Sequence, residues 1–253
     1  MALAPGAIIR NLDGDVHAAW SDASKGDLRP TGPGPDDGIP LAGLARELGR
    51  TTGATTERVA WLTQVHGSGV RAVWWEASPS GSTGIPALWH LGAGDAMVSM
   101  TPGVALCVLT ADCGAVALSS PEGIFGAVHA GWRGLVDGVV EQAVDRMRGW
   151  GATDVTAALG PCIHAPCYEF GGAELDRIAA VYGPSVRGTT TDGGVALDLV
   201  AGVTAAATGS GARMVGGADV CTSCGGGYFS HRARADTGRQ ALLVWSSASV
   251  AAL

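Results

Sequence analysis

The sequence is poor in charged residues, in tyrosine and phenylalanine, and in long apolar runs. Only 15% of the 253 residues are charged, and there are three tyrosines and three phenylalanines. Acidic residues outnumber lysine and arginine by 23 to 16, and a formal net charge of −7 argues against nucleic-acid binding. No stretch reaches the roughly 18 consecutive apolar residues of a membrane-spanning helix. We therefore expect a protein that acts neither on nucleic acid nor in a membrane.

The six cysteines are too few for a disulfide scaffold in a chain of this length. The N-terminus also lacks the basic region and long apolar core of a secretion signal. We therefore expect a cytoplasmic protein with reduced cysteines. Each cysteine is then a packing residue, a nucleophile or a metal ligand.

Apolar residues make up 47% of the chain, which is enough for a large buried core. Residues 21–40 are rich in turn-forming residues and predict an exposed loop. A short helix is predicted over 41–48, ending at Gly49. We find no repeat and no linker long enough to mark a boundary, so residues 1–253 are expected to form a single domain.

Three apolar runs, over 104–109, 115–119 and 123–129, predict core strands. Residues 58–65 and 70–75 predict a strand pair around a turn at 66–69. Apolar residues at helical spacing from Leu135 to Met147 predict a helix. Further strands are predicted over 155–159, 194–199 and 240–245, and further helices over 172–182 and 200–208. This mixture predicts an α/β fold whose sheets are covered by helices.

Three potential metal ligands fall at the ends of predicted strands: His66, Cys113 and His129. Two imidazoles and one thiolate suit Zn²⁺, and three protein ligands leave a fourth position for water or substrate. An open position is what a catalytic zinc requires. The alternative interpretation is a core thiol and two histidines that make ordinary hydrogen bonds.

Four other cysteines offer a competing interpretation. Cys162, Cys167, Cys221 and Cys224 form a C-x4-C pair and a C-x2-C pair, which predicts a structural zinc cluster. The separation between the two pairs, however, is more than twice that usual in zinc ribbons.

Two segments could bind an anion. The turn from His129 to Gly134 leads into the strongest predicted helix, where backbone amides and Arg133 could bind a phosphate. A basic cluster near the C-terminus could bind a phosphate or carboxylate, or be a solvated loop; it consists of His231, Arg232, Arg234 and Arg239.

Six short motifs stand in a recognisable order from about residue 58 to 245. They are Gln64–Gly67 (QVHG), Thr110–Cys113 (TADC), His129–Gly134 (HAGWRG), Gly160–Ile163 (GPCI), Cys167–Phe170 (CYEF) and Tyr228–Arg232 (YFSHR) with Thr237–Arg239 (TGR). Together they resemble the bacterial laccase-domain family, also labelled polyphenol oxidase-like, purine nucleoside phosphorylase or peptidoglycan-editing factor.

The resemblance implies a single α/β domain, a layered sandwich of two mixed β-sheets flanked by helices. It also implies a zinc ion bound by His66, Cys113 and His129, with Cys162 and Cys167 as residues that line or pack against the pocket. Copper is the less favoured metal, since laccase copper centres need more histidines than the six present.

The activities that the resemblance implies are phosphorolysis of adenosine, inosine, guanosine or methylthioadenosine, together with adenosine deamination. One alternative is an amidase of the same family that edits peptidoglycan precursors. Another is a zinc-binding protein that has lost catalysis, because residues 25–30 and 44–48 depart from the family's N-terminal pattern.

Roles follow from motif position. We expect Cys113, Asp112 and Arg232 to be catalytic, and we expect the substrate to contact Gln64, Arg133, Glu169 and His231. The partners are then small molecules, a purine nucleoside and phosphate. The protein is expected to be a monomer or a homodimer.

Overall fold

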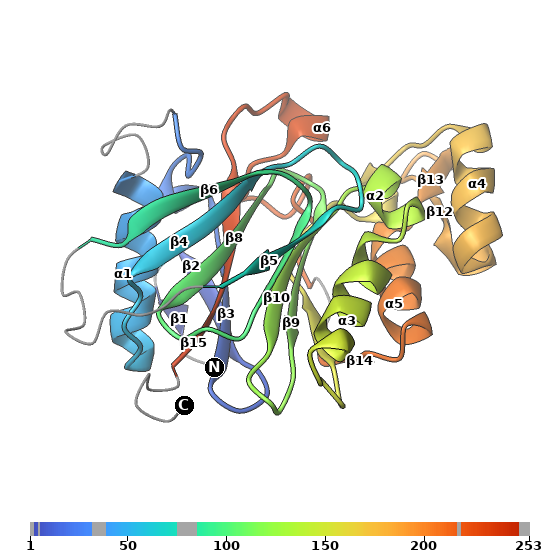
Figure 1. The fold of residues 1–253 in the computed structure, drawn as a ribbon. Helices are drawn as coiled ribbons and strands as arrows, with labels where there is room; N and C mark the ends of the chain where they lie inside the picture. Colours follow the sequence, from blue (N-terminus) through green and yellow to red (C-terminus); the bar gives the residue numbers. More distant parts are fainter. Residues whose placement is uncertain (1–2, 5, 32–38, 75–84, 217–218, 248–253) are drawn as a thin grey trace.

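Two β-sheets pack face to face, and helices cover both outer faces (Figure 1). The computed structural model describes residues 3–4, 6–31, 39–74, 85–216 and 219–247. Within these ranges no helix is both long enough and apolar enough to cross a membrane. The predicted sandwich of two mixed sheets flanked by helices is confirmed.

The first sheet has seven strands and combines the two ends of the chain. Its order is β1 (Leu3–Ala4), β2 (Ala7–Asn11), β3 (Val16–Ser21), β15 (Gln240–Ser246), β8 (Val104–Thr110), β4 (Arg58–Thr63) and β6 (Ala87–Ala93). β15 pairs antiparallel with β3 and β8, whereas β4 pairs parallel with β8 and β6. The last strand of the chain therefore occupies the centre of this sheet.

The second sheet has six strands. Its order is β14 (Arg213–Met214), β11 (Thr156–Leu159), β9 (Gly114–Ser119), β10 (Phe125–Ala130), β7 (Ala96–Ser99) and β5 (Val70–Val73). Since β8 ends at Thr110 and β9 begins at Gly114, residues 111–113 carry the chain from one sheet to the other. Cys113 therefore lies at the junction of the two sheets.

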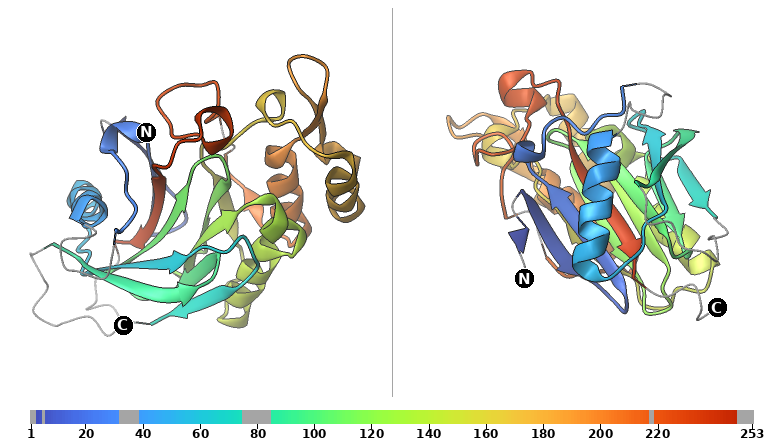
Figure 2. Two further views of the ribbon diagram at one scale, coloured as in Figure 1. Left: turned by 90° about the horizontal axis from the view of Figure 1, so that it is seen from above. Right: turned by 90° about the vertical axis from the view of Figure 1, so that its left-hand side faces the viewer.

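Strands β8, β9 and β10 are buried on both faces, which explains their continuous apolar sequences. In β8, Leu106 and Val108 pack between the sheets, while Ala105 and Cys107 pack in the cluster that contains α1 (Ile39–Thr52). Helix α1 lies across the outer face of the first sheet (Figure 2). The alternation of side chains along a strand thus supplies two cores from one apolar run.

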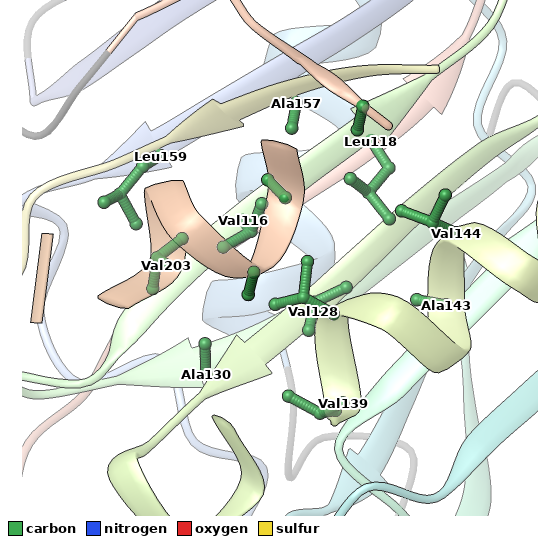
Figure 3. Close-up of a cluster of buried hydrophobic side chains, with 14 of the residues drawn as sticks. Val116, Leu118, Val128, Ala130, Val139, Ala143, Val144, Ala157, Leu159 and Val203 are labelled. Atoms are coloured by element: carbon green, nitrogen blue, oxygen red, sulfur yellow. The ribbon is translucent and has the colours of Figure 1, made fainter. Parts of the chain in front are cut away.

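Helices α3 (Val139–Gly149) and α5 (Leu199–Gly209) cover the outer face of the second sheet. Figure 3 shows this layer, in which Val128 of β10 lies near Ala143 of α3 and Val116 of β9 lies near α5. Beyond it lie α2 (Trp132–Val136), α4 (Gly172–Tyr182) and the small sheet of β12 (Arg187–Thr189) and β13 (Val195–Leu197) (Figure 1). The short helix α6 (His231–Arg234) precedes β15.

The prediction that residues 58–65 pair with 70–75 is wrong. β4 lies in the first sheet and β5 in the second, where it pairs parallel with β7. The intervening turn contains His66 in a left-handed conformation, with φ 59°, and carries the chain between the sheets. Both strands find parallel partners later in the chain, a choice that the local pattern cannot reveal.

Two helix boundaries also differ from the prediction. The helix predicted from Leu135 to Met147 is split into α2 and α3, because Gly138 adopts φ 80° and interrupts the helical hydrogen bonds. Helix α1 continues past Gly49 to Thr52 and ends before Gly53, which has φ 75°.

Several strands were not predicted from the sequence, and part of one predicted loop is not described by the structure. Strands β2, β3, β6 and β7 fall where no strand was predicted, since each is a short run stabilised by its neighbours in the sheet. Residues 32–38 of the predicted loop 21–40 lie outside the described residues.

Candidate metal centre and substrate cavity

The three predicted metal ligands converge where strands of the two sheets end. His66 lies in the turn after β4, Cys113 in the connection from β8 to β9, and His129 near the end of β10. One ligand atom from each lies within 4.8 Å of the other two. The imidazole rings of His66 and His129 are 4.9 Å apart between centroids and nearly perpendicular, at 80°.

A buried carboxylate organises two of these ligands. Asp95 follows β6 and is fully buried, and its Oδ1 lies 2.8 Å from the Nδ1 atom of His129. The amides of Val65, His66 and Gly67 donate to the same carboxylate at 3.2, 2.9 and 2.8 Å. Burial would raise the pKa of Asp95, but the hydrogen bonds from His129 and Gly67 hold it below its usual value. Because Nδ1 is occupied, Nε2 of His129 is the atom available to a metal.

Two glycines of the HAGWRG motif allow the ligands to approach. A Cβ atom on Gly131 would lie 2.8 Å from Cδ2 of His66 and 3.3 Å from Sγ of Cys113. A Cβ atom on Gly134 would lie 2.5 Å from the carbonyl oxygen of Gly67. The turn of His66 therefore rests directly on the backbone around α2, beside which it lies in Figure 1.

The Cys113 and His129 side chains form an interacting charged pair. Burial raises the pKa of the Cys113 thiol, but His129 and His66 together lower it to about 6. Burial lowers the pKa of His129, but Cys113 and Asp95 raise it to about 9. The interaction between the two side chains therefore favours the thiolate of Cys113 beside the imidazolium of His129.

This arrangement fits a divalent zinc ion. The donor atoms of a tetrahedral zinc lie about 3.3–3.8 Å apart, and one ligand atom from each of the three side chains lies within 4.8 Å of the other two. The lowered pKa of Cys113 favours the thiolate form that zinc binds, and a carboxylate orients one histidine, as is usual for metal-bound imidazole. The three residues would supply three of the four ligands of a zinc ion, and all three line a cavity.

The cavity has a volume of about 550 Å³ and is lined by aromatic and cationic side chains. A volume of this size suits a small-molecule ligand. His66, Cys113 and His129 all line it. Its aromatic residues are Trp61, Trp132 and Tyr168, and its arginines are Arg29, Arg133, Arg232 and Arg239.

Two of the predicted functional side chains are engaged in structural hydrogen bonds at the cavity wall. Gln64 donates to the carbonyl of Leu109 and accepts from its amide, both at 2.8 Å, and so joins the end of β4 to β8. Asp112 has φ 97°, and its carboxylate accepts from Thr222 Oγ1 at 2.6 Å and from the Arg232 amide at 2.7 Å. Both residues line the cavity, but their polar atoms already have protein partners.

Two of the arginines predicted to bind an anion, Arg133 and Arg232, lie against aromatic rings. The guanidinium of Arg133 lies 4.5 Å from the ring centre of Trp132, and that of Arg232 lies 4.9 Å from Tyr168. Arg232 also donates to the carbonyl oxygen of Glu169 at 2.7 Å. Within the described residues, neither arginine is ion-paired with a carboxylate.

Two further residues were predicted to contact the substrate, and only one of them lines the cavity. His231 lines the cavity, whereas the exposed side chain of Glu169 is not among the residues that line it. Sequence reasoning missed Asp95, for which the only local signal is a Gly-Asp pair between short strands. It also missed Arg29, although this residue lies in the N-terminal segment that departs from the family pattern.

Known proteins similar to this chain agree with the motifs. Residues 37–247 match the family model described as multi-copper polyphenol oxidoreductase laccase. The chain is 35% identical over 245 residues to the purine nucleoside phosphorylase ORF3 of Streptomyces griseus, covering 92% of this chain and 96% of that protein. It is 39% identical over 204 residues to a purine nucleoside phosphorylase of Streptomyces coelicolor, covering 79% and 80%.

Solved structures of the same kind share the fold. The Neisseria meningitidis protein NMB0706 has a TM-score of 0.73 and 23% identity, with 96% of this chain and all of that chain covered. The Bacillus licheniformis hypothetical protein YfiH has a TM-score of 0.71 and 23% identity, with 91% and 92% covered. Since the family model spans most of the sequence and includes all three clustered ligands, the chain belongs to the multi-copper polyphenol oxidoreductase laccase family.

Proposed function

We propose that this protein is a zinc-dependent purine nucleoside phosphorylase that also deaminates adenosine. Its substrates would be adenosine, inosine, guanosine or methylthioadenosine, with phosphate as the second substrate. The observation that carries the proposal is the joint position of a His-Cys-His ligand set and four arginines around one cavity. The relatives named purine nucleoside phosphorylase support it independently.

Phosphorolysis requires an anion site next to the ribose. Arg133 and Arg232 supply it, because each guanidinium is fixed by an aromatic ring and keeps donors for a phosphate. The five-residue helix α2 is too short to contribute much through its dipole, so the arginines carry this role in place of the helix start.

The purine base would bind against the aromatic residues of the cavity. Trp132 packs edge-to-face on Phe170 with ring centres 5.5 Å apart, and Tyr168 packs on Phe170 at 5.3 Å, so their positions are fixed before a ligand enters. His231, at the start of α6, can donate a proton to the departing base.

His66, Cys113 and His129 would hold the zinc ion. When bound, zinc would polarise a substrate oxygen or lower the pKa of a water for deamination. Asp112 acts in this proposal as a positioning residue, since its two carboxylate oxygens accept hydrogen bonds from Thr222 and from the Arg232 amide. It holds Arg232 and the neighbouring Cys113 in a fixed relation.

Zinc is proposed over the copper of the family's name. A His-His-Cys set also occurs in blue-copper sites, but those add a weak axial ligand, usually methionine. No methionine is found among the described residues that line the cavity. Only three histidines line the cavity, which is too few to bind a trinuclear copper cluster in addition to a blue-copper ion.

The proposal is tested by incubating metal-quantified protein with adenosine and phosphate, and following ribose 1-phosphate, inosine and adenine by chromatography. We expect phosphate-dependent adenine and ribose 1-phosphate, with inosine as the deamination product. His66→Ala should abolish all three products together with the bound zinc, at little cost in stability because His66 is exposed.

Other outcomes favour the alternatives. One zinc per catalytic site without any of these products would overturn the nucleoside proposal. Release of an amino acid from a peptidoglycan precursor would then favour the editing amidase. Inactivity on both substrates would favour a zinc-binding protein that has lost catalysis. We place the reaction in the cytoplasm, since all six cysteines are free thiols.

A further inference from the structure

A second cluster of thiols lies next to the cavity. Cys167 ends a short 3-10 helix, Ala165–Cys167, and Cys221 and Cys224 lie in the turn that leads toward α6. The three Sγ atoms lie within 4.8 Å of one another. Cys162, the fourth cysteine of the sequence pattern, is fully buried and does not belong to this group.

The backbone around Cys221 directs amide groups at its sulfur. The His164 amide donates to Cys221 Sγ at 3.4 Å, and the backbone at Ser223 and Cys224 also lowers the pKa of this thiol. Such donors stabilise a thiolate, and they are oriented by a tight turn in which the Gly225 amide donates to the Cys221 carbonyl at 2.8 Å. A Cβ atom on Gly225 would lie 2.5 Å from that carbonyl oxygen, so the turn requires glycine.

The surroundings also compensate negative charge. The guanidinium of Arg234 donates to the carbonyl oxygen of Ser223 at 3.0 Å and to that of Thr222 at 3.5 Å. This cation therefore lies against the turn that carries two of the thiols. Three thiolates with one divalent cation have a net charge of −1, and Arg234, which also pairs with Asp236 at 3.0 Å, offsets part of it.

The cluster connects segments that build the cavity. Thr222, between the two cysteines of the turn, donates to Asp112 at 2.6 Å, and Asp112 precedes Cys113. Cys167 precedes Tyr168, which lines the cavity and stacks with Arg232. An ion bound by all three thiols would fasten the Tyr168 segment to the segment that leads to Arg232.

We propose that Cys167, Cys221 and Cys224 bind a second zinc ion, which has a structural role and is separate from the ion at His66, Cys113 and His129. Three thiolates supply three of the four ligands that a structural zinc takes, and because Cys224 is exposed, water would supply the fourth. A disulfide would join only two of the three sulfurs and leave one thiol over, whereas one ion uses all three.

The test counts zinc in protein that is reduced, stripped with a chelator and reloaded with Zn²⁺ alone. We expect two zinc ions per chain in the parent protein and one in Cys113→Ser, which disables the first site. Cys224→Ser should also retain one, and the double variant none. Cys167→Ser serves as a second variant, and Cys162→Ala, adjacent but outside the cluster, should retain two.

Cobalt loading gives a second readout that does not depend on activity. The thiolate-to-cobalt absorption of Cys113→Ser should arise from three sulfurs and should disappear in the double variant with Cys224→Ser. A single zinc in the parent and none in Cys113→Ser would overturn the second site. This result is separable from failure of the proposed nucleoside chemistry, since the count requires no substrate.

Discussion

The Asp95 carboxylate lies 2.8 Å from Nδ1 of His129 and receives, on its two oxygens, the amides of the turn that carries His66. One fully buried side chain thus sets the orientation of one metal ligand and the backbone position of another. Because His129 comes from the second sheet and His66 from the turn that leaves the first, Asp95 connects the sheets at the metal site.

Replacement of Asp95 by asparagine is expected to weaken zinc binding roughly 10- to 100-fold, as is typical for loss of a carboxylate that orients a metal-bound histidine. The amide keeps the size of the side chain but loses the charge and one acceptor. Competition with a chromophoric chelator measures the affinity. Asp198→Asn, at the N-cap of α5, is the matched control and should bind zinc as the parent does. Equal affinities in both variants would contradict the role of Asp95.

Alanine at Gly134 is expected to disturb the metal site through the backbone. The new methyl group would meet the Gly67 carbonyl at 2.5 Å, so the turn of His66 must move. We expect a loss of about 1–3 kcal/mol in the free energy of unfolding, as for other overpacked sites, together with weaker zinc binding. Denaturant unfolding and zinc titration measure the two effects. Gly149→Ala, in α3 with no atom within 4 Å of its Cβ position, is the control and should lose neither stability nor zinc affinity.

The metal-free protein is expected to show an unusually reactive Cys113. Its pKa of about 6 lies below that of an ordinary thiol, so the nucleophilic thiolate forms as the pH rises through about 6. The rate of alkylation by iodoacetamide, followed by peptide mass spectrometry, should reach its plateau near neutral pH. Cys107, whose pKa is raised by complete burial, should remain unmodified. A midpoint near pH 9 for Cys113 would show that His129 does not stabilise its thiolate.

Arg232→Gln is expected to raise the KM for phosphate about 10- to 100-fold, since a hydrogen bond to a charged group contributes about 1.5–3 kcal/mol. The KM for the nucleoside should change less, because the aromatic residues remain. Initial rates at varied phosphate concentration measure the effect. Arg187→Gln removes a surface arginine paired with Asp176 and should leave both constants unchanged. A rise confined to the nucleoside KM would reassign Arg232 to the nucleoside.

Local sequence patterns predicted the parts of the fold that depend on burial of both strand faces. β8, β9 and β10 have continuous apolar sequences because each packs against two layers. The apolar residues of α3 recur at helical spacing because only one face of this helix is buried. The same patterns failed for β4 and β5, where two adjacent strands join different sheets. A strand's own residues do not specify which distant strand supplies its hydrogen bonds.

The sequence by itself determined the chemistry available at the metal centre: two imidazoles and a thiolate at strand ends, with glycines beside them. Only the tertiary structure decided which side chains support that centre. Asp95, Arg29 and Thr222, one of the partners of Asp112, come from segments distant in sequence and carry no motif of their own. Their roles arise from the packing of two sheets, which brings strand ends together and buries polar groups that must then find partners.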